Sequence, residues 1–295
     1  MEKKMERIDF RDQISRNKRK SFFLLSIIFS IIILLGFLIS QIYSPDSFLF
    51  IIIFSGIISF CYVFFSYVYS DKIALFSVGA KLADPEKYRD YYRLVEGLTI
   101  SSGLPMPKLY IMESNQINAF ASGRSPEKAV ICVTTGALKK LERRELEGVL
   151  AHELGHVQNY DIRYMTLVSV AVGMVSIISN LFLRSLWFRG NDRDNKNSIF
   201  LILGIILAIL SPIFIFFVQM AISRKREFSA DASSVKFTRY PEGLIRALKK
   251  IQQEEKIPEK KVNQAVAPLF FADPLGKMSS THPPIEERIK VLEKM

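Results

Sequence analysis

Four long apolar stretches separated by polar sections set the pattern of this chain. The stretch from Ser21 to Pro45 carries no charged side chain, and a second uncharged stretch runs from Phe48 to Tyr69 after a short turn. Each is long enough to cross the hydrocarbon core of a bilayer as a helix. Basic residues are frequent in the solvated lead-in of residues 1–20 and absent from the turn. We therefore predict a transmembrane hairpin over residues 21–70 with both ends in the cytoplasm.

Two further apolar stretches lie in the second half of the chain, at Met165–Leu183 and Ile199–Ile222. Their length favours spanning the membrane. Against this, the loop between them is basic, which the positive-inside rule does not expect of an outer loop. Its basic residues are Arg184, Arg189, Arg193 and Lys196. We predict that residues 165–222 form two further apolar helices embedded in the membrane. The alternative to spanning is a hairpin that packs on the polar part of the protein or lies partly in the membrane.

From Asp71 onward, the spacing of the apolar residues changes twice. It begins with an amphipathic helical pattern that ends at a segment rich in glycine and proline. Three short segments rich in β-branched and aromatic residues follow, separated by turn-forming residues, and they predict a small antiparallel sheet. These segments are KLYIM, INAFAS and KAVICVTT. From Gly136 the pattern is helical again, and the chain ends in a helix predicted from about Pro284.

Composition agrees with a mainly α integral membrane protein. Hydrophobic residues make up 49% of the chain and mean hydropathy is +0.19. The net charge is +11, but the basic residues cluster beside the apolar stretches, so no nucleic-acid partner is predicted and the partner is a lipid bilayer. Cys61 and Cys132 are far apart, and both are interpreted as small apolar side chains, neither as a disulfide nor as metal ligands.

The polar section contains one motif with clear chemistry, HELGH. On a helix, His152 and His156 lie one turn apart on the same side, so both can reach one metal ion, and Glu153 lies beside that ion. This pattern is a signature of zinc proteases. The helix is predicted to run straight into the apolar stretch that begins at Met165, which places the site close to the membrane surface.

A catalytic zinc site needs three protein ligands and one open position for water. The third histidine of a metzincin is excluded, because Ile162 occupies its position. Glu227, on a later predicted helix, is the candidate third ligand, and Asp231 on the same face could accept a hydrogen bond from the outer nitrogen of His152. Two alternatives stay open: His282 could be the third ligand, or Glu227 and Asp231 could be surface carboxylates. In the second case they would counter Arg224, Lys225 and Arg226.

These motifs together resemble a known family. HELGH followed by REFSAD, with NAFASG before them and STHPP near the end, is similar to the HtpX-like membrane metalloproteases, which are gluzincins related to the CAAX prenyl endopeptidases. The resemblance extends from Ser21 to the end of the chain. It implies a helical gluzincin catalytic domain, in two parts over residues 71–164 and 223–295, that binds one Zn2+ per chain.

The resemblance also implies roles for individual residues. Glu153 would take the proton of the attacking water and pass it to the leaving amine. His282 and Arg288 would stabilise the oxyanion of the tetrahedral intermediate. An edge strand would bind the substrate in an extended form by β-augmentation. The residues of that strand are Asn118, Ala119, Phe120 and Ala121.

The sequence thus predicts a multi-pass zinc endopeptidase of the cell membrane, with its active site facing the cytoplasm and with membrane proteins or peptides as substrates. By the resemblance, its role is quality control of misfolded or surplus membrane proteins. One alternative is a narrow processing peptidase of lipidated or prenylated tails. Another is a non-catalytic membrane scaffold that retains the zinc fold, although the intact Glu153 argues against it.

Overall fold

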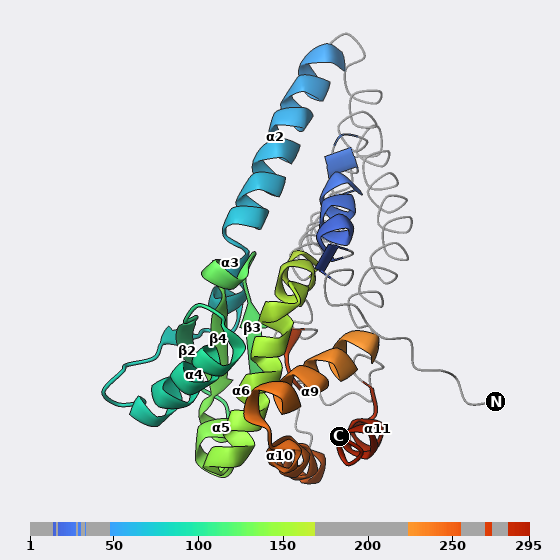
Figure 1. Ribbon diagram of the computed structural model, residues 1–295. Coiled ribbons are helices and arrows are strands. Elements are labelled where there is room, and N and C mark those ends of the chain that lie inside the picture. Colours follow the sequence, from blue (N-terminus) through green and yellow to red (C-terminus); the bar gives the residue numbers. More distant parts are fainter. Residues whose placement is uncertain are drawn as a thin grey trace, which may run out of the picture.

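The computed structural model of the chain shows a long helix, α2, that projects from a body of helices and strands (Figure 1). Most of the first apolar stretch, nearly all of the third, the whole fourth stretch and His282 lie outside the described residues. The structure describes residues 14–15, 17–27, 29–30, 33, 48–168, 224–254, 269–272 and 283–295.

Helix α2 (Phe48–Val68) forms where the second apolar stretch predicts it and is followed by α3 (Ser70–Ser77). Many of its large apolar side chains are exposed, among them Phe50, Ile53, Phe60 and Phe65. Within the described part of the chain, no single helix has the length and apolarity of a membrane span. One bent pair, 52–68 and 70–77, meets that length and composition together with a bend of 74°.

A four-stranded sheet forms from the predicted segments and one short additional strand. Its order is β1-β2-β4-β3, which places β3 at an edge. The strands are β1 (Lys81–Leu82), β2 (Lys108–Met112), β3 (Ala119–Ser122) and β4 (Val130–Thr134). The predicted antiparallel sheet is wrong for one pair, because β2 and β4 run parallel while β1–β2 and β3–β4 are antiparallel. The chain reverses direction before β3 and again after it, so β2 and β4 point the same way.

Helix α6 (Arg143–Gln158), which carries HELGH, lies at the centre of the body between β3 and the later helices (Figure 1). It begins with a capping box in which Glu142 and Glu145 satisfy each other's backbone N–H groups. Its neighbours leave it buried over most of its length. The surrounding helices are α4 (Arg89–Ser102), α5 (Thr135–Lys140), α9 (Arg224–Thr238), α10 (Pro241–Gln253) and α11 (Ile285–Leu292).

Helix α6 ends before the third apolar stretch instead of continuing straight into it. Asn159 is its C-cap, and Tyr160 has a φ of 57°, a left-handed conformation that is rare for a bulky residue. Helical structure resumes over residues 161–168. The predicted continuous helix is therefore wrong, because a break separates HELGH from the apolar segment.

The glycine of HELGH allows α9 to approach α6 closely. A Cβ on Gly155 would lie 2.9 Å from Cβ of Ser233 and 3.1 Å from Cα of Ala230. Both atoms belong to α9, the helix that carries Glu227 and Asp231. The close approach of backbones at Gly155 thus brings the second set of site residues to HELGH.

Replacing Gly155 with alanine is expected to lower the free energy of unfolding by about 1–3 kcal/mol, because α9 must shift to admit the methyl group. The same shift should weaken zinc binding. Gly97→Ala on α4 is the matched control: its new Cβ would meet no atom within 4 Å, and better helix propensity should stabilise by up to about 1 kcal/mol. Thermal unfolding of both variants in detergent measures the difference, and equal melting temperatures would contradict it.

Candidate metal centre

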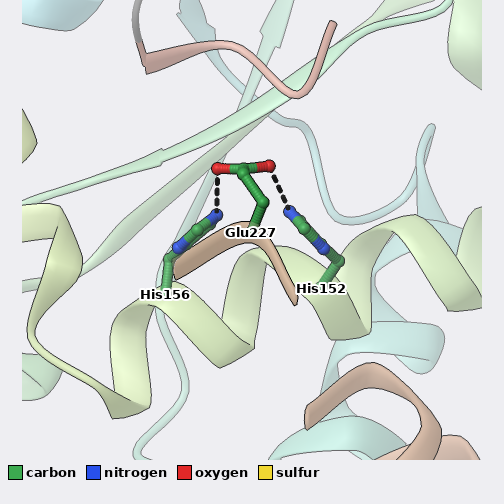
Figure 2. A group of neighbouring side chains, drawn as sticks. All are labelled: His152, His156 and Glu227. Atoms are coloured by element: carbon green, nitrogen blue, oxygen red, sulfur yellow. Dashed lines mark ion pairs between the residues drawn. The ribbon is translucent and has the colours of Figure 1, made fainter. Parts of the chain in front are cut away.

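Three side chains from two helices converge on one point. Figure 2 shows the carboxylate of Glu227 between the rings of His152 and His156, with one oxygen toward each ring. Oε2 of Glu227 is 3.7 Å from Nε2 of His152, and Oε1 is 3.6 Å from Nε2 of His156. These are too long for hydrogen bonds. One ligand atom from each residue lies within 4.8 Å of the others.

The spacing fits a shared Zn2+ ion. Ligand atoms about 2.0–2.2 Å from a tetrahedral zinc are roughly 3.4 Å from one another. All three side chains are buried. Among the residues that the structure describes, Nε2 of His152 is buried and has no hydrogen-bond partner. A buried imidazole nitrogen without a partner is costly unless a metal ion binds it. The alternative of surface carboxylates is wrong, since Glu227 and Asp231 are 3% and 0% exposed.

Behind His152, a buried carboxylate fixes the ring. Nδ1 of His152 is 2.8 Å from Oδ1 of Asp231, so the ring donates there and turns Nε2 toward the metal position. Arg288 on α11 donates to both carboxylate oxygens, from Nη2 to Oδ1 at 2.7 Å and from Nε to Oδ2 at 2.9 Å. Such a bidentate pair fixes the carboxylate plane. The predicted contact of Asp231 with the outer nitrogen of His152 is present in the structure.

His156 has its own carboxylate, which the sequence analysis missed. Nδ1 of His156 is 3.1 Å from Oδ2 of Asp161, the first residue after the left-handed Tyr160. The break between α6 and residues 161–168 turns the chain so that Asp161 faces back toward the end of α6. A carboxylate five residues after the second histidine is the only sequence signal that could have indicated this partner.

Without a bound ion, the two histidines differ in charge. Burial lowers the pKa of His152 to about 4, with the positive charge of Arg288 acting in the same direction. Burial alone would also lower the pKa of His156, but the hydrogen bond to Asp161 and the charges of Glu227, Asp161 and Glu153 together raise it to about 9. Near neutral pH, His152 is therefore neutral and His156 carries a proton.

Zinc binding at pH 7.5 is expected to release about one proton, because a ligand imidazole must be neutral and His156 is protonated below pH 9. Apparent affinity should rise roughly tenfold per pH unit between pH 7 and 9. Calorimetry in buffers of different ionisation enthalpy counts the protons. Asp161→Asn removes a group that raises the pKa of His156, so it should reduce the release; an affinity independent of pH would contradict the prediction.

The remaining predicted residues lie in different positions around this centre. Glu153 is buried on α6 beside the two ligands, and its charge raises the pKa of both His156 and Arg288. Nη1 of Arg288 is 3.6 Å from Oε2 of Glu227. The predicted contact of Arg288 with an oxyanion stays a prediction, and His282 lies outside the described residues.

Three of the four residues predicted to bind substrate, Ala119, Phe120 and Ala121, lie in β3, and the outer edge of β3 is already paired. Phe120 forms an antiparallel bridge with Phe270, and the N–H of Phe271 donates to the carbonyl of Ala119 at 2.8 Å. The ring of Phe271 contacts the His152 ring edge-on, with centroids 4.9 Å apart. No pattern in the sequence predicted that this segment, 269–272, is a neighbour of the site.

Two histidines on one helix, a glutamate on a later helix and carboxylates behind both rings define a zinc metallopeptidase of the gluzincin class. Comparison with known proteins agrees, since residues 85–295 match Peptidase family M48. The chain belongs to this family and is a zinc metalloendopeptidase with His152, His156 and Glu227 as its zinc site.

The relatives that match over most of their own length are HtpX homologues. "Protease HtpX homolog" of Caldanaerobacter subterraneus subsp. tengcongensis is 44% identical over 253 residues, covering 83% of this chain and 84% of the relative. The homologue of Dictyoglomus turgidum is 39% identical over 99% of this chain and 96% of its own length. Among solved structures, Ste24p of S. mikatae is similar with a TM-score of 0.49 and 20% identity, covering 95% of this chain and 66% of that one.

Proposed function

We propose that this zinc metalloendopeptidase is a multi-pass protein of the cell membrane. It cleaves peptide bonds at the cytoplasmic face and acts in quality control of misfolded or surplus membrane proteins. The observation that carries the proposal is the convergence of His152, His156 and Glu227 on one buried point beside Glu153. A bound Zn2+ supplies an acidified water and polarises the substrate carbonyl.

The chain's own residues divide the remaining work. Glu153 accepts the proton of the attacking water and returns it to the leaving amine. Asp231 and Asp161 hold the two imidazoles in the tautomer that turns Nε2 toward the ion. Arg288 keeps Asp231 ionised: burial alone would raise the pKa of this carboxyl, but the charge of Arg288 and the hydrogen bond from His152 lower it. Direct stabilisation of the oxyanion by His282 and Arg288 remains part of the proposal.

The exposed apolar surface of α2 supports the membrane location. Phe50 is 71% exposed, Ile53 62% and Phe60 63%, and these large side chains lie on one half of the helix, opposite the buried Ser55 and Ser59. An exposed apolar face of this size is stable against lipid and costly in water. The hairpin of residues 21–70 and the embedded segments of residues 165–222 complete this arrangement in the proposal.

The edge of β3 binds an extended substrate in this proposal, and residues 269–272 indicate how. Asn118 donates from its side-chain amide to the carbonyl of Ala272 at 2.8 Å and accepts from the N–H of Ala272 at 3.0 Å. The side-chain amide of Asn118 thus pairs with the backbone of one residue beside the edge, in addition to the backbone bonds by which a sheet edge recognises an extended peptide. A substrate that adds to β3 must therefore displace residues 269–272.

Phe270→Ala is expected to lower KM for an extended peptide by roughly threefold or more, because weaker binding of residues 269–272 leaves the β3 edge available for more of the time. Phe270 packs against Phe120 with ring centroids 4.9 Å apart. Leu248→Ala on α10 is the control, as it also removes a buried side chain but does not belong to the core cluster that contains Phe120 and Phe270. Steady-state kinetics would contradict the prediction if KM stayed the same or rose.

Reconstitution tests the function itself. The purified full chain in lipid vesicles is incubated with several unrelated membrane proteins, with and without a chelator, and cleavage sites are mapped by mass spectrometry. Zinc-dependent cuts at many cytoplasmic sites support quality control. A single cut confined to lipidated or prenylated tails would instead show a processing peptidase, and no zinc-dependent cut in any protein would favour a non-catalytic scaffold.

A further inference from the structure

The amino-terminal segment reaches the metal centre through one buried side chain. Asn17 is 3% exposed although it lies in the predicted solvated lead-in. Its amide nitrogen donates to Oδ1 of Asp161 at 2.6 Å and to the carbonyl of Asn159 at 3.0 Å. An asparagine amide has two N–H donors, so both are used. Asn17 is 144 residues from Asp161 along the chain.

This contact completes the set of bonds around Asp161. Oδ2 of the carboxylate faces Nδ1 of His156, and Oδ1 accepts from Asn17, so each oxygen has a different partner. Asp161 is fully buried, where an oxygen without a donor would be costly. With Oδ1 held by Asn17, the carboxylate has one orientation in which Oδ2 meets the imidazole.

Neighbouring residues also contact the break between α6 and residues 161–168. Tyr160 keeps its left-handed conformation between the two bonded residues, and Nζ of Lys18 lies 4.5 Å from the centroid of its ring. The hydroxyl of Ser21 donates to the carbonyl of Asn17 at 2.9 Å, one helical turn later. The conformation of the break after α6 thus depends on contacts made by the segment before the first apolar stretch.

We propose that Asn17 is a positioning residue of the zinc site, which orients His156 through Asp161 and so makes the amino-terminal segment a structural part of the metallopeptidase. Asn17 does not touch the metal position itself. Its effect comes from the direction of its hydrogen bonds, since it donates to a buried carboxylate without adding charge.

Zinc affinity of the full chain in detergent, measured by competition with a chromogenic chelator, tests this proposal. Outer partners of metal ligands typically change metal affinity about 10–100-fold, so Asn17→Ala should raise the zinc Kd by roughly tenfold. Asn17→Asp should raise it further, because a carboxylate of nearly the same shape faces Asp161 and cannot donate. Arg19→Ala, at an exposed position of the same segment, should change the Kd by less than about twofold.

A swap of the two side chains separates hydrogen bonding from packing. In the double variant Asn17→Asp with Asp161→Asn, the amide introduced at position 161 donates to the carboxylate introduced at position 17, and the amide oxygen accepts from His156. This variant should bind zinc at least about threefold more tightly than Asn17→Asp alone, with partial recovery because the carbonyl of Asn159 lacks a donor.

The ranking of the variants by zinc Kd decides between the two roles, even if some variants are less stable than wild type. A packing role predicts that the isosteric Asn17→Asp binds zinc better than Asn17→Ala, and that the swap gives no recovery. Either result, or a wild-type Kd in both single variants, would overturn the proposal. Melting temperatures of the metal-free proteins are measured alongside. An equal decrease of melting temperature in all variants, without a change in zinc Kd, would also contradict the proposal.

Discussion

Glu153→Gln lowers kcat for peptide hydrolysis by at least about a hundredfold and leaves one zinc bound per chain; this is the result expected of a general base. The amide has nearly the shape of the carboxylate, so the buried position on α6 keeps its packing. It cannot accept the proton of the attacking water. Hydrolysis rates and zinc content are measured on the same preparation of protein.

The control for this variant is Glu147→Gln on the same helix. Glu147 is a surface residue paired with Arg144 at 2.9 Å, and such exposed pairs contribute little to stability or activity. Its kcat should equal that of wild type. Full activity of Glu153→Gln, including self-cleavage, would remove Glu153 from the mechanism and favour the scaffold alternative, provided that zinc is still bound.

The second large effect is expected at the third ligand. Glu227→Ala should weaken zinc binding by well over about 100-fold, because losing a direct ligand costs more than losing an outer partner. Wild-type protein should also gain roughly 2.7 kcal/mol of stability at a zinc concentration of 100 times Kd, and the variant should lose this gain. Metal analysis after gel filtration and melting curves with added zinc measure both effects.

His282→Ala is the informative comparison for Glu227→Ala, since His282 is the alternative third ligand in the sequence. The geometry of Glu227 between both imidazoles predicts that His282→Ala keeps its zinc. If the histidine variant loses zinc while the glutamate variant keeps it, the assignment of Glu227 is wrong. In that case, Asp231→Asn would show whether Asp231, which lies on α9 with Glu227, still supports His152.

Much of the site could be predicted because its chemistry follows helical spacing. His152 and His156 share a face whatever surrounds the helix, and Glu227 and Asp231 share a face in the same way. The segments that became β2, β3 and β4 were visible from their β-branched residues and turns. The mainly α fold with a small sheet is therefore confirmed, as is the zinc ligand set.

Pairing between distant segments could not be predicted in the same way. The parallel register of β2 and β4, with Tyr110 opposite Cys132, depends on two chain reversals whose direction no local pattern specifies. The pairing of residues 269–272 with β3 depends on which distant segment the rest of the fold places beside the open edge. A short strand of four residues gives no signal for its partner.

The sequence by itself indicated the metal, two of its ligands and the base, because His152, Glu153 and His156 lie within about one helical turn, and it offered Glu227 as the candidate third ligand with His282 as the alternative. Tertiary structure alone decided what holds them. The left-handed Tyr160 turns Asp161 toward His156, and Asn17 reaches that carboxylate from 144 residues away. Helical spacing extends over a turn or two, whereas these contacts follow from packing of the whole chain, which fixes backbone conformations that local preference disfavours.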